Sequence, residues 1–112
     1  MQLEFIPDQD ALDSFFAAEA SCEDDVRIYA ATDESGIELR FSYNLCDNSI
    51  QTWLGRGGVC LAVVCNERLA RMWLYRDTLQ AECDYEGGRV RLVLTIRPRI
   101  EVQWHGLEVR KG

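Results

Sequence analysis

The clearest pattern in the sequence is an alternation of apolar and polar positions that begins near residue 26. It is most regular from Ile37 to Leu45, where apolar side chains occupy every second position and polar ones lie between them. Such alternation is typical of a strand with one buried face and one face in water. Shorter runs of the same kind predict further strands at residues 26–30, 50–54, 72–75, 79–85, 90–96 and 100–104.

The segment at residues 8–20 has a helical period instead. Leu12, Phe15 and Phe16 form one apolar stripe, and Asp8 stands where a helix N-cap is expected. We therefore predict a helix over residues 8–20. Before it, Leu3 and Phe5 alternate with polar residues and predict a short opening strand.

Three segments are read from local composition. Residues 59–65 are apolar at every position, which predicts a central strand covered by the helix. Asn66 and Glu67 predict a hairpin turn into the next strand, although residues 69–72 also fit a helix. His105 and Gly106 predict a turn near the end of the chain.

Together these elements predict an α+β fold. Its core is a twisted antiparallel sheet, a meander of about eight strands, with one N-terminal helix packed on it. The connections are too short for parallel crossovers, which need a dozen or more residues. A chain of 112 residues fits a single domain, 1–112.

Composition narrows the class of protein. Apolar residues make up 47% of the chain, but no apolar run approaches the ~20 residues of a membrane helix. Glu4 lies where a signal peptide would carry basic residues, so we expect no membrane association and a cytoplasmic location.

Charge is divided unevenly along the chain. Residues 1–48 contain twelve acidic residues and two arginines, a net charge of −10, whereas residues 49–112 contain seven acidic and ten basic residues, a net charge of +3. A concentrated negative potential at one end of the fold repels nucleic acid and attracts basic proteins. The alternative is that these acidic residues only keep a small protein soluble.

The densest acidic group lies on the predicted helix and in the loop that follows it. Like charges held together slightly destabilise a fold, so a cationic partner that neutralises them accounts for their clustering. We therefore predict a partner-binding surface formed by Asp8, Asp10, Asp13, Glu23, Asp24 and Asp25.

The five cysteines show no regular spacing and no C-x-x-C pair. A zinc site needs four well-placed donors, and His105 is the only histidine. We expect the cysteines to be small buried side chains with free thiols in a reducing compartment, and we expect no metal site.

No enzyme class is supported by the sequence. His105 has no nucleophile beside it, and the many carboxylates lie in solvated segments where nothing would raise a pKa. The glycine-rich residues 55–58 lack the Lys-Ser/Thr ending of a phosphate loop. We expect no catalytic residues and no cofactor.

Three features carry a resemblance to a known class of protein. They are the acidic helical segment at residues 8–20, the alternating strand at residues 37–43 and the final segment at residues 97–104. In a short acidic chain, they resemble the immunity proteins of bacterial polymorphic toxin systems. The resemblance implies a tight complex with a cognate toxin or effector domain, whose active site is blocked. Whether such a protein is a monomer or a homodimer stays open.

Two other classes remain as alternatives. The first is a small-ligand-binding or regulatory module, with an apolar pocket near Trp53, Trp73 and Trp104. The second is an assembly adaptor that pairs through an exposed strand edge. The arginines of the second half have a simpler explanation, which is that they line the wet face of the C-terminal hairpin and pair across strands with acidic residues. The arginines are Arg89, Arg91, Arg97 and Arg99, and the acidic residues are Glu82, Asp84, Glu86 and Glu101.

Overall fold

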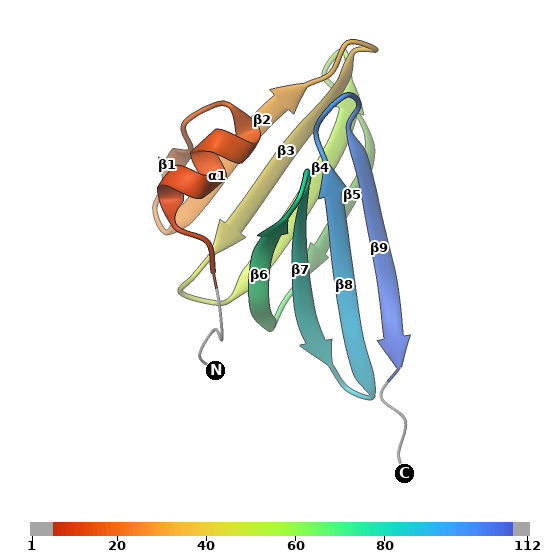
Figure 1. Cartoon of the computed structure of the whole chain (residues 1–112). Helices are drawn as coiled ribbons and strands as arrows, with labels where there is room; N and C mark the ends of the chain where they lie inside the picture. Colours follow the sequence, from red (N-terminus) through yellow and green to blue (C-terminus); the bar gives the residue numbers. More distant parts are fainter. Residues whose placement is uncertain (1–5, 109–112) are drawn as a thin grey trace.

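The structure, a computed structural model, describes residues 6–108 of the chain. These residues form one helix and nine strands (Figure 1). The elements are α1 (Gln9–Phe16), β1 (Ser21–Glu23), β2 (Val26–Thr32), β3 (Ile37–Asn44), β4 (Ser49–Arg56), β5 (Val59–Asn66), β6 (Leu69–Tyr75), β7 (Thr78–Tyr85), β8 (Gly88–Thr95) and β9 (Glu101–Glu108).

The helix begins where the sequence predicts and ends earlier. The Asp8 carboxylate accepts a hydrogen bond from the Ala11 N–H at 2.8 Å, as an N-cap does. Ala17 adopts a left-handed conformation with φ 55° and ends the helix, so the predicted extension to residue 20 is wrong. The predicted strand at Leu3 and Phe5 lies outside the described residues.

The strands form two antiparallel sheets, ordered β1-β2-β3-β4-β5 and β6-β7-β8-β9. Each paired strand lies beside its neighbour in sequence, so the predicted α+β class and meander connectivity are confirmed. The chain changes sheet after Asn66, and the predicted hairpin there is wrong. The Leu69 N–H donates to the Asn48 carbonyl in the first sheet, and the Asp84 N–H donates to the Arg68 carbonyl, which holds this connection between the sheets.

A single core lies between the two sheets and α1. The helix and the four-stranded sheet cover the same face of the five-stranded sheet (Figure 1). Leu12 and Phe16 anchor the helix, and the Phe16 ring stacks on Tyr29 with centroids 4.4 Å apart and on Phe41 at 5.5 Å. Burial of this apolar stripe compensates for the low intrinsic stability of a short helix.

Strand β5 differs most from its prediction. It lies at the edge of the five-stranded sheet, and Val59, Leu61 and Val63 are 65%, 60% and 55% exposed. The prediction of a central, covered strand is wrong because α1 packs near β2, at the other side of the sheet. An apolar run cannot specify which partner will cover it.

Two smaller predictions also change. His105 and Gly106 continue β9 and do not form a turn. Cys83 is buried, but Cys22, Cys46, Cys60 and Cys65 are exposed, so the prediction of buried thiols holds for one of the five. These four lie in a short edge segment, in a turn or on β5, where little of the chain packs over them. Among the described residues, no helix has the length and apolar character needed to cross a membrane.

Candidate protein-binding surface

The strand registers divide the turns between two opposite ends of the molecule. Val26 pairs with Asn44, so the β1–β2 and β3–β4 turns share one end. The Leu69–Asn48 hydrogen bond brings the β5–β6 connection to that end, and the Asp84–Arg68 hydrogen bond brings the β7–β8 turn there. We call this end, formed by residues 24–25, 45–48, 67–68 and 86–87, the acidic end.

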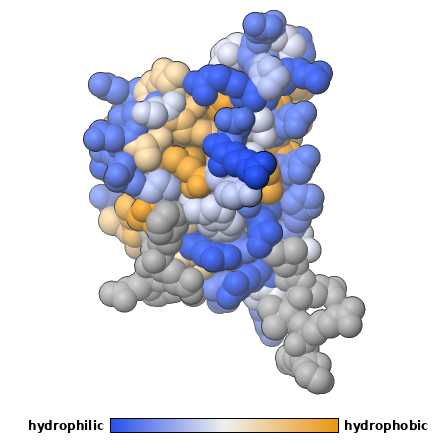
Figure 2. Space-filling view, viewed as in Figure 1, coloured by the Kyte–Doolittle hydropathy of each residue, from blue (hydrophilic) through white to orange (hydrophobic). Residues whose placement is uncertain are grey.

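The acidic end has a net charge of −4 in its turns alone. All its charged side chains are exposed: five acidic residues and one arginine, namely Asp24, Asp25, Asp47, Glu67, Glu86 and Arg68. Between the grey terminal segments, the lower part of the visible surface is hydrophilic (Figure 2). The exposed turns at one end of the molecule therefore carry the negative charge that the distribution along the chain predicts.

The turns at the other end are balanced. They comprise residues 33–36, 57–58, 76–77 and 96–100, and we call them the opposite end. Their charges sum to zero, since they hold three acidic residues and three arginines: Asp33, Glu34, Asp77, Arg76, Arg97 and Arg99. The Arg97 guanidinium donates to the Phe15 carbonyl at 3.1 Å, which ties this end to the helix.

Glu23, Asp24 and Asp25, three of the predicted binding residues, lie together. They occupy the end of β1 and the β1–β2 turn, and all three are exposed. The sequence signal that located them was their adjacency in the chain. Glu67 and Glu86 were not predicted, because Glu67 reaches the acidic end through the pairing of β5 with β4, and Glu86 reaches it through the packing of the second sheet.

The three predicted helix residues have different environments. Asp8 and Asp10 are exposed at the start of α1. This end of the helix lies on the same side of the molecule as the β1–β2 turn (Figure 1). Asp13 is half-buried, and its Oδ1 accepts a hydrogen bond from the Tyr29 hydroxyl at 2.6 Å. Burial and this hydrogen bond raise the pKa of Tyr29 well above its ordinary value, so the hydroxyl remains a donor.

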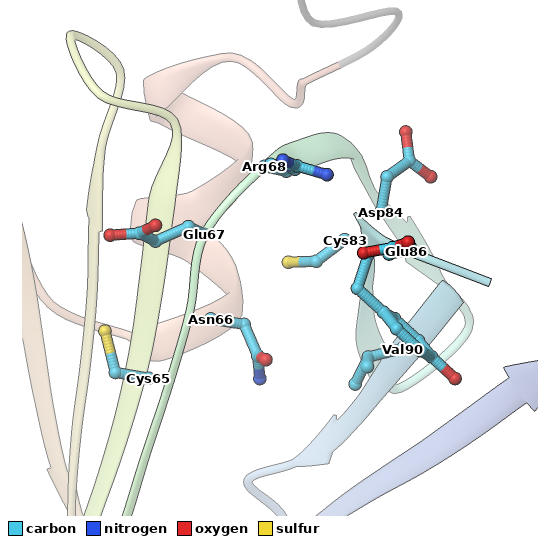
Figure 3. Close-up of a pocket in the computed structure, with 9 residues that line it drawn as sticks. Cys65, Asn66, Glu67, Arg68, Cys83, Asp84, Glu86 and Val90 are labelled. Atoms are coloured by element: carbon cyan, nitrogen blue, oxygen red, sulfur yellow. The ribbon is translucent and has the colours of Figure 1, made fainter. Parts of the chain in front are cut away.

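A cavity of about 510 Å³ opens at the acidic end, between the two sheets (Figure 3). One wall comes from the end of β5 and the β5–β6 connection, and the other comes from β7 and β8. Its lining residues are Cys65, Asn66, Glu67, Arg68, Cys83, Asp84, Tyr85, Glu86 and Val90. Three carboxylates and one arginine therefore surround a space large enough for a partner's side chain.

Two thiols near the acidic end, those of Cys83 and Cys46, are not activated. Burial, and then the nearby Asp84 carboxylate, raise the pKa of the Cys83 thiol to about 12. A hydrogen bond from the Cys46 thiol to the Asp25 carboxylate raises the pKa of Cys46. Both thiols are protonated at neutral pH, which is the opposite of what a nucleophilic cysteine requires.

A second polar cluster lies on the outer face of the four-stranded sheet. Glu82 is 2% exposed and accepts hydrogen bonds from Arg71 at 2.6 Å and from Arg91 at 2.7 Å. Burial would raise the pKa of Glu82, but these two hydrogen bonds outweigh it and lower the pKa. Arg89 pairs with Asp84 at 3.2 Å. The predicted cross-strand pairing is confirmed for Arg89 and Arg91, which pair with Glu82 and Asp84. It is wrong for the face on which Arg97 and Arg99 lie, because both belong to the connection between β8 and β9.

The three tryptophans lie apart. Trp53 lies under the Arg40 guanidinium on the five-stranded sheet, and the Trp73 ring lies beneath Arg71 on the four-stranded sheet. The Trp104 Nε1–H donates to the Thr52 hydroxyl between the sheets at 3.0 Å. They do not share a pocket among the described residues, so the tryptophan-lined pocket of the ligand-binding alternative is not found.

A different apolar hollow exists between α1 and the four-stranded sheet. It has a volume of about 460 Å³ and includes Phe15, Leu74 and Ile96 in its lining. Hydrophobic residues are visible in this region of the surface (Figure 2). His105 is not near it: the ring lies exposed on β9, with Nε2 3.3 Å from the Gln103 Oε1.

Comparison with known proteins gives one strong structural likeness. No model of a protein family matches the chain, and no curated protein matches it in sequence. Among solved structures, it is similar to a chain of the contact-dependent growth inhibition toxin–immunity protein complex from Klebsiella pneumoniae 342. The TM-score is 0.87 at 22% identity, over 96% of this chain and 100% of that chain. The two chains share a fold.

Proposed function

We propose that this chain is an immunity protein that binds a cognate toxin domain in the cytoplasm and blocks its active site, without being an enzyme itself. The observation that carries the proposal is the structural likeness to a chain from a toxin–immunity complex, because it extends over 96% of this chain at a TM-score of 0.87. The likeness covers the helix and both sheets together.

Charge favours the immunity component over the toxin component of such a pair. The chain has a net charge of −7, and the acidic end concentrates exposed carboxylates. A toxin that acts on nucleic acid needs cationic side chains to contact phosphates. Carboxylates can occupy those cationic positions, which blocks access of the substrate and accelerates association with the toxin.

The proposed contact surface combines the predicted residues with those of the second sheet. Glu23, Asp24 and Asp25 provide an exposed part of it at the β1–β2 turn, and Asp8 and Asp10, also exposed, extend it along the start of α1. Asp13 belongs to the same surface and is held in place through Tyr29. The cavity at the acidic end offers a recess for a basic side chain of the toxin.

The direct test is protection of growing cells. The first step is to determine whether a neighbouring gene encodes a large secreted protein; the C-terminal domain of that protein is then produced alone or together with the chain. We expect the domain alone to stop growth and the chain to restore it, with a stable complex on co-purification. Loss of growth caused by the chain itself, or no rescue and no complex, would contradict the proposal.

The contact surface is tested by association kinetics. Replacing Glu23, Asp24 and Asp25 together with alanine removes three exposed charges, and thermal unfolding verifies that the variant is folded. We expect slower association with the toxin domain at low salt and a weaker dependence on salt, because exposed charges act mainly on the association rate. Identical rates at low and high salt would show that these residues form only a solvated surface.

The hollow between α1 and the four-stranded sheet supports a second candidate, a small-ligand-binding or regulatory module. Its lining is partly apolar, as ligand sites usually are. Replacing Leu74 with lysine introduces a charged side chain at this hollow. Under our proposal the variant still protects cells, whereas a ligand-dependent function would be lost.

A further inference from the structure

Strand β5 presents an open edge that the rest of the described chain does not cover. In the five-stranded sheet it pairs with β4 along one side, and its other side faces outward. None of its eight residues, Val59–Asn66, is charged or proline. Val59, Leu61 and Val63 are 65%, 60% and 55% exposed, which makes them the most exposed large apolar residues described.

Such an edge is a template for another strand. Its backbone N–H and C=O groups can pair with a second chain, and proteins normally protect edges with charges, proline, bulges or a covering element. β5 has one of these devices, a bulge: Cys60 pairs with Gly55 and Ala62 with Leu54, so Leu61 is the extra residue. The segment beyond the bulge, residues 62–66, pairs regularly with β4 and leaves a regular outer edge.

We propose that two copies of this chain associate through β5, with the two β5 strands antiparallel. The two five-stranded sheets would then form one continuous sheet of ten strands. The exposed aliphatic side chains of each copy would cover those of the other, which removes apolar surface from water. This homodimer is independent of the toxin-binding proposal.

The charge distribution favours a second copy in this orientation. Glu67 follows β5 at the acidic end, whereas Arg56, Gly57 and Gly58 precede it at the opposite end. Antiparallel pairing therefore brings the acidic end of each copy, with a net turn charge of −4, beside the balanced end of the other. Parallel pairing would place both acidic ends side by side and is opposed by repulsion.

A basic partner is less suited to this edge. A cationic protein is attracted to the carboxylates of the acidic end, while β5 itself offers no charge to it. An uncharged, aliphatic strand is complementary to another of the same kind. In the antiparallel dimer, the two acidic ends lie at opposite ends of the paired strands, and their exposed turns, residues 24–25, 45–48 and 86–87, remain accessible to toxin.

The dimer should be weak. An eight-residue strand spans about 27 Å, and a stable interface buries about 800 Å² on each partner, so strand pairing alone lies at the low end of specific interfaces. Association should therefore depend on concentration, with monomer and dimer in exchange.

Sedimentation equilibrium tests the proposal on the full chain. We expect the apparent mass to rise with concentration from 12.8 kDa toward twice that value. Val63→Lys places like charges near one another across the pair and should weaken association about tenfold or more. Tyr75→Lys is the matched control, because Tyr75 is also exposed, at 54%, but lies on β6 in the other sheet. Thermal unfolding of both variants verifies that they are folded.

Cross-linking gives a second measurement. With Cys22 and Cys46 replaced by serine, the exposed thiols described are Cys60 and Cys65, both on β5. A short bismaleimide should then yield covalent dimer, and Val63→Lys should suppress it. A constant mass of 12.8 kDa with no covalent dimer, or equal dimerisation of wild type and Val63→Lys, would overturn the proposal. Toxin protection by Val63→Lys should be unaffected, so failure of the dimer and failure of the immunity function are distinguishable.

Discussion

Two turns of the five-stranded sheet each contain two adjacent acidic residues, but these residues have different roles. Asp33, in the β2–β3 turn, accepts hydrogen bonds from the N–H groups of Ser35, Ile37 and Ile100 and from the Ser35 hydroxyl. Ile100 belongs to the connection before β9, so one carboxylate joins the two sheets. By contrast, Asp24 and Asp25, in the β1–β2 turn, are exposed at the acidic end.

The difference between Asp33 and the β1–β2 turn shows which carboxylates stabilise the fold. A turn carboxylate stabilises the fold when several backbone N–H groups donate to it, because each of these N–H groups would otherwise have no hydrogen-bond partner after folding. Glu82 shows the same principle on a strand, where arginines converge on a buried side chain. At the acidic end, no such convergence of backbone N–H groups or arginines is described around the exposed carboxylates, so these carboxylates are available to a partner.

The largest expected effect is at Glu82. Glu82→Ala removes the carboxylate that Arg71 and Arg91 share and should lower the free energy of unfolding by about 2 kcal/mol. The loss stays below that of a fully buried ion pair, because these arginine side chains are 39% and 37% exposed and can be solvated. Asp84→Ala is the control and should cost less than about 1 kcal/mol. Urea denaturation measures both, and equal losses would contradict this distinction.

The next effect concerns Asp33 and pH. The hydrogen bond from the Ile100 N–H, followed by that from Ser35, lowers the pKa of Asp33 from 3.8 to about 2. Because the folded-state pKa is lowered, Asp33 contributes stability above pH 4, and this contribution is lost as the pH falls toward 2. Asp33→Asn should be less stable at pH 7 and lose less stability than wild type between pH 4 and pH 2. Parallel stability curves for the two proteins would contradict the assignment, and Glu34→Gln should behave as wild type.

A smaller effect is expected on the association rate when two charges are removed from one end or from the other. Glu67→Gln with Glu86→Gln removes two charges from the acidic end, whereas Glu34→Gln with Asp77→Asn removes two from the opposite end. At low salt, the first pair should slow association with the toxin domain about threefold, and the second should change it less. Stopped-flow kinetics measures both rates. Equal slowing would show that total charge, and not its position, governs association.

The smallest effect is local to the acidic end. The Asp25 carboxylate accepts a hydrogen bond from the Cys46 thiol and raises its pKa, so Asp25→Ala should lower that pKa. Alkylation of Cys46 by iodoacetamide at pH 8 should then be faster, as followed by peptide mass spectrometry. Glu23→Ala removes a neighbouring charge without this hydrogen bond and serves as control. An unchanged alkylation rate in Asp25→Ala would show that the Asp25 carboxylate does not cause the raised pKa of Cys46.

Local pattern was sufficient to predict most of the strands and the start of the helix. It missed β1, Ser21–Glu23, whose residues were expected to form a loop after the helix. Alternation specifies that one face of a strand is buried, and Asp8 before the apolar stripe of α1 specifies where the helix begins. These features depend on neighbouring residues in the chain, so they can be read from the sequence. The antiparallel meander follows from the short connections between strands.

Tertiary structure alone decided which surfaces remain open. Residues 59–65 have the composition of a covered strand, yet β5 lies at an edge because α1 packs over another part of the sheet. Similarly, Glu86 joins Asp24 and Asp25 at the acidic end only because the second sheet packs with its β7–β8 turn at that end. The sequence determines the period and the charge of each segment. Which segments become neighbours depends on packing between residues far apart in the chain, and that packing selects the surfaces available to a partner.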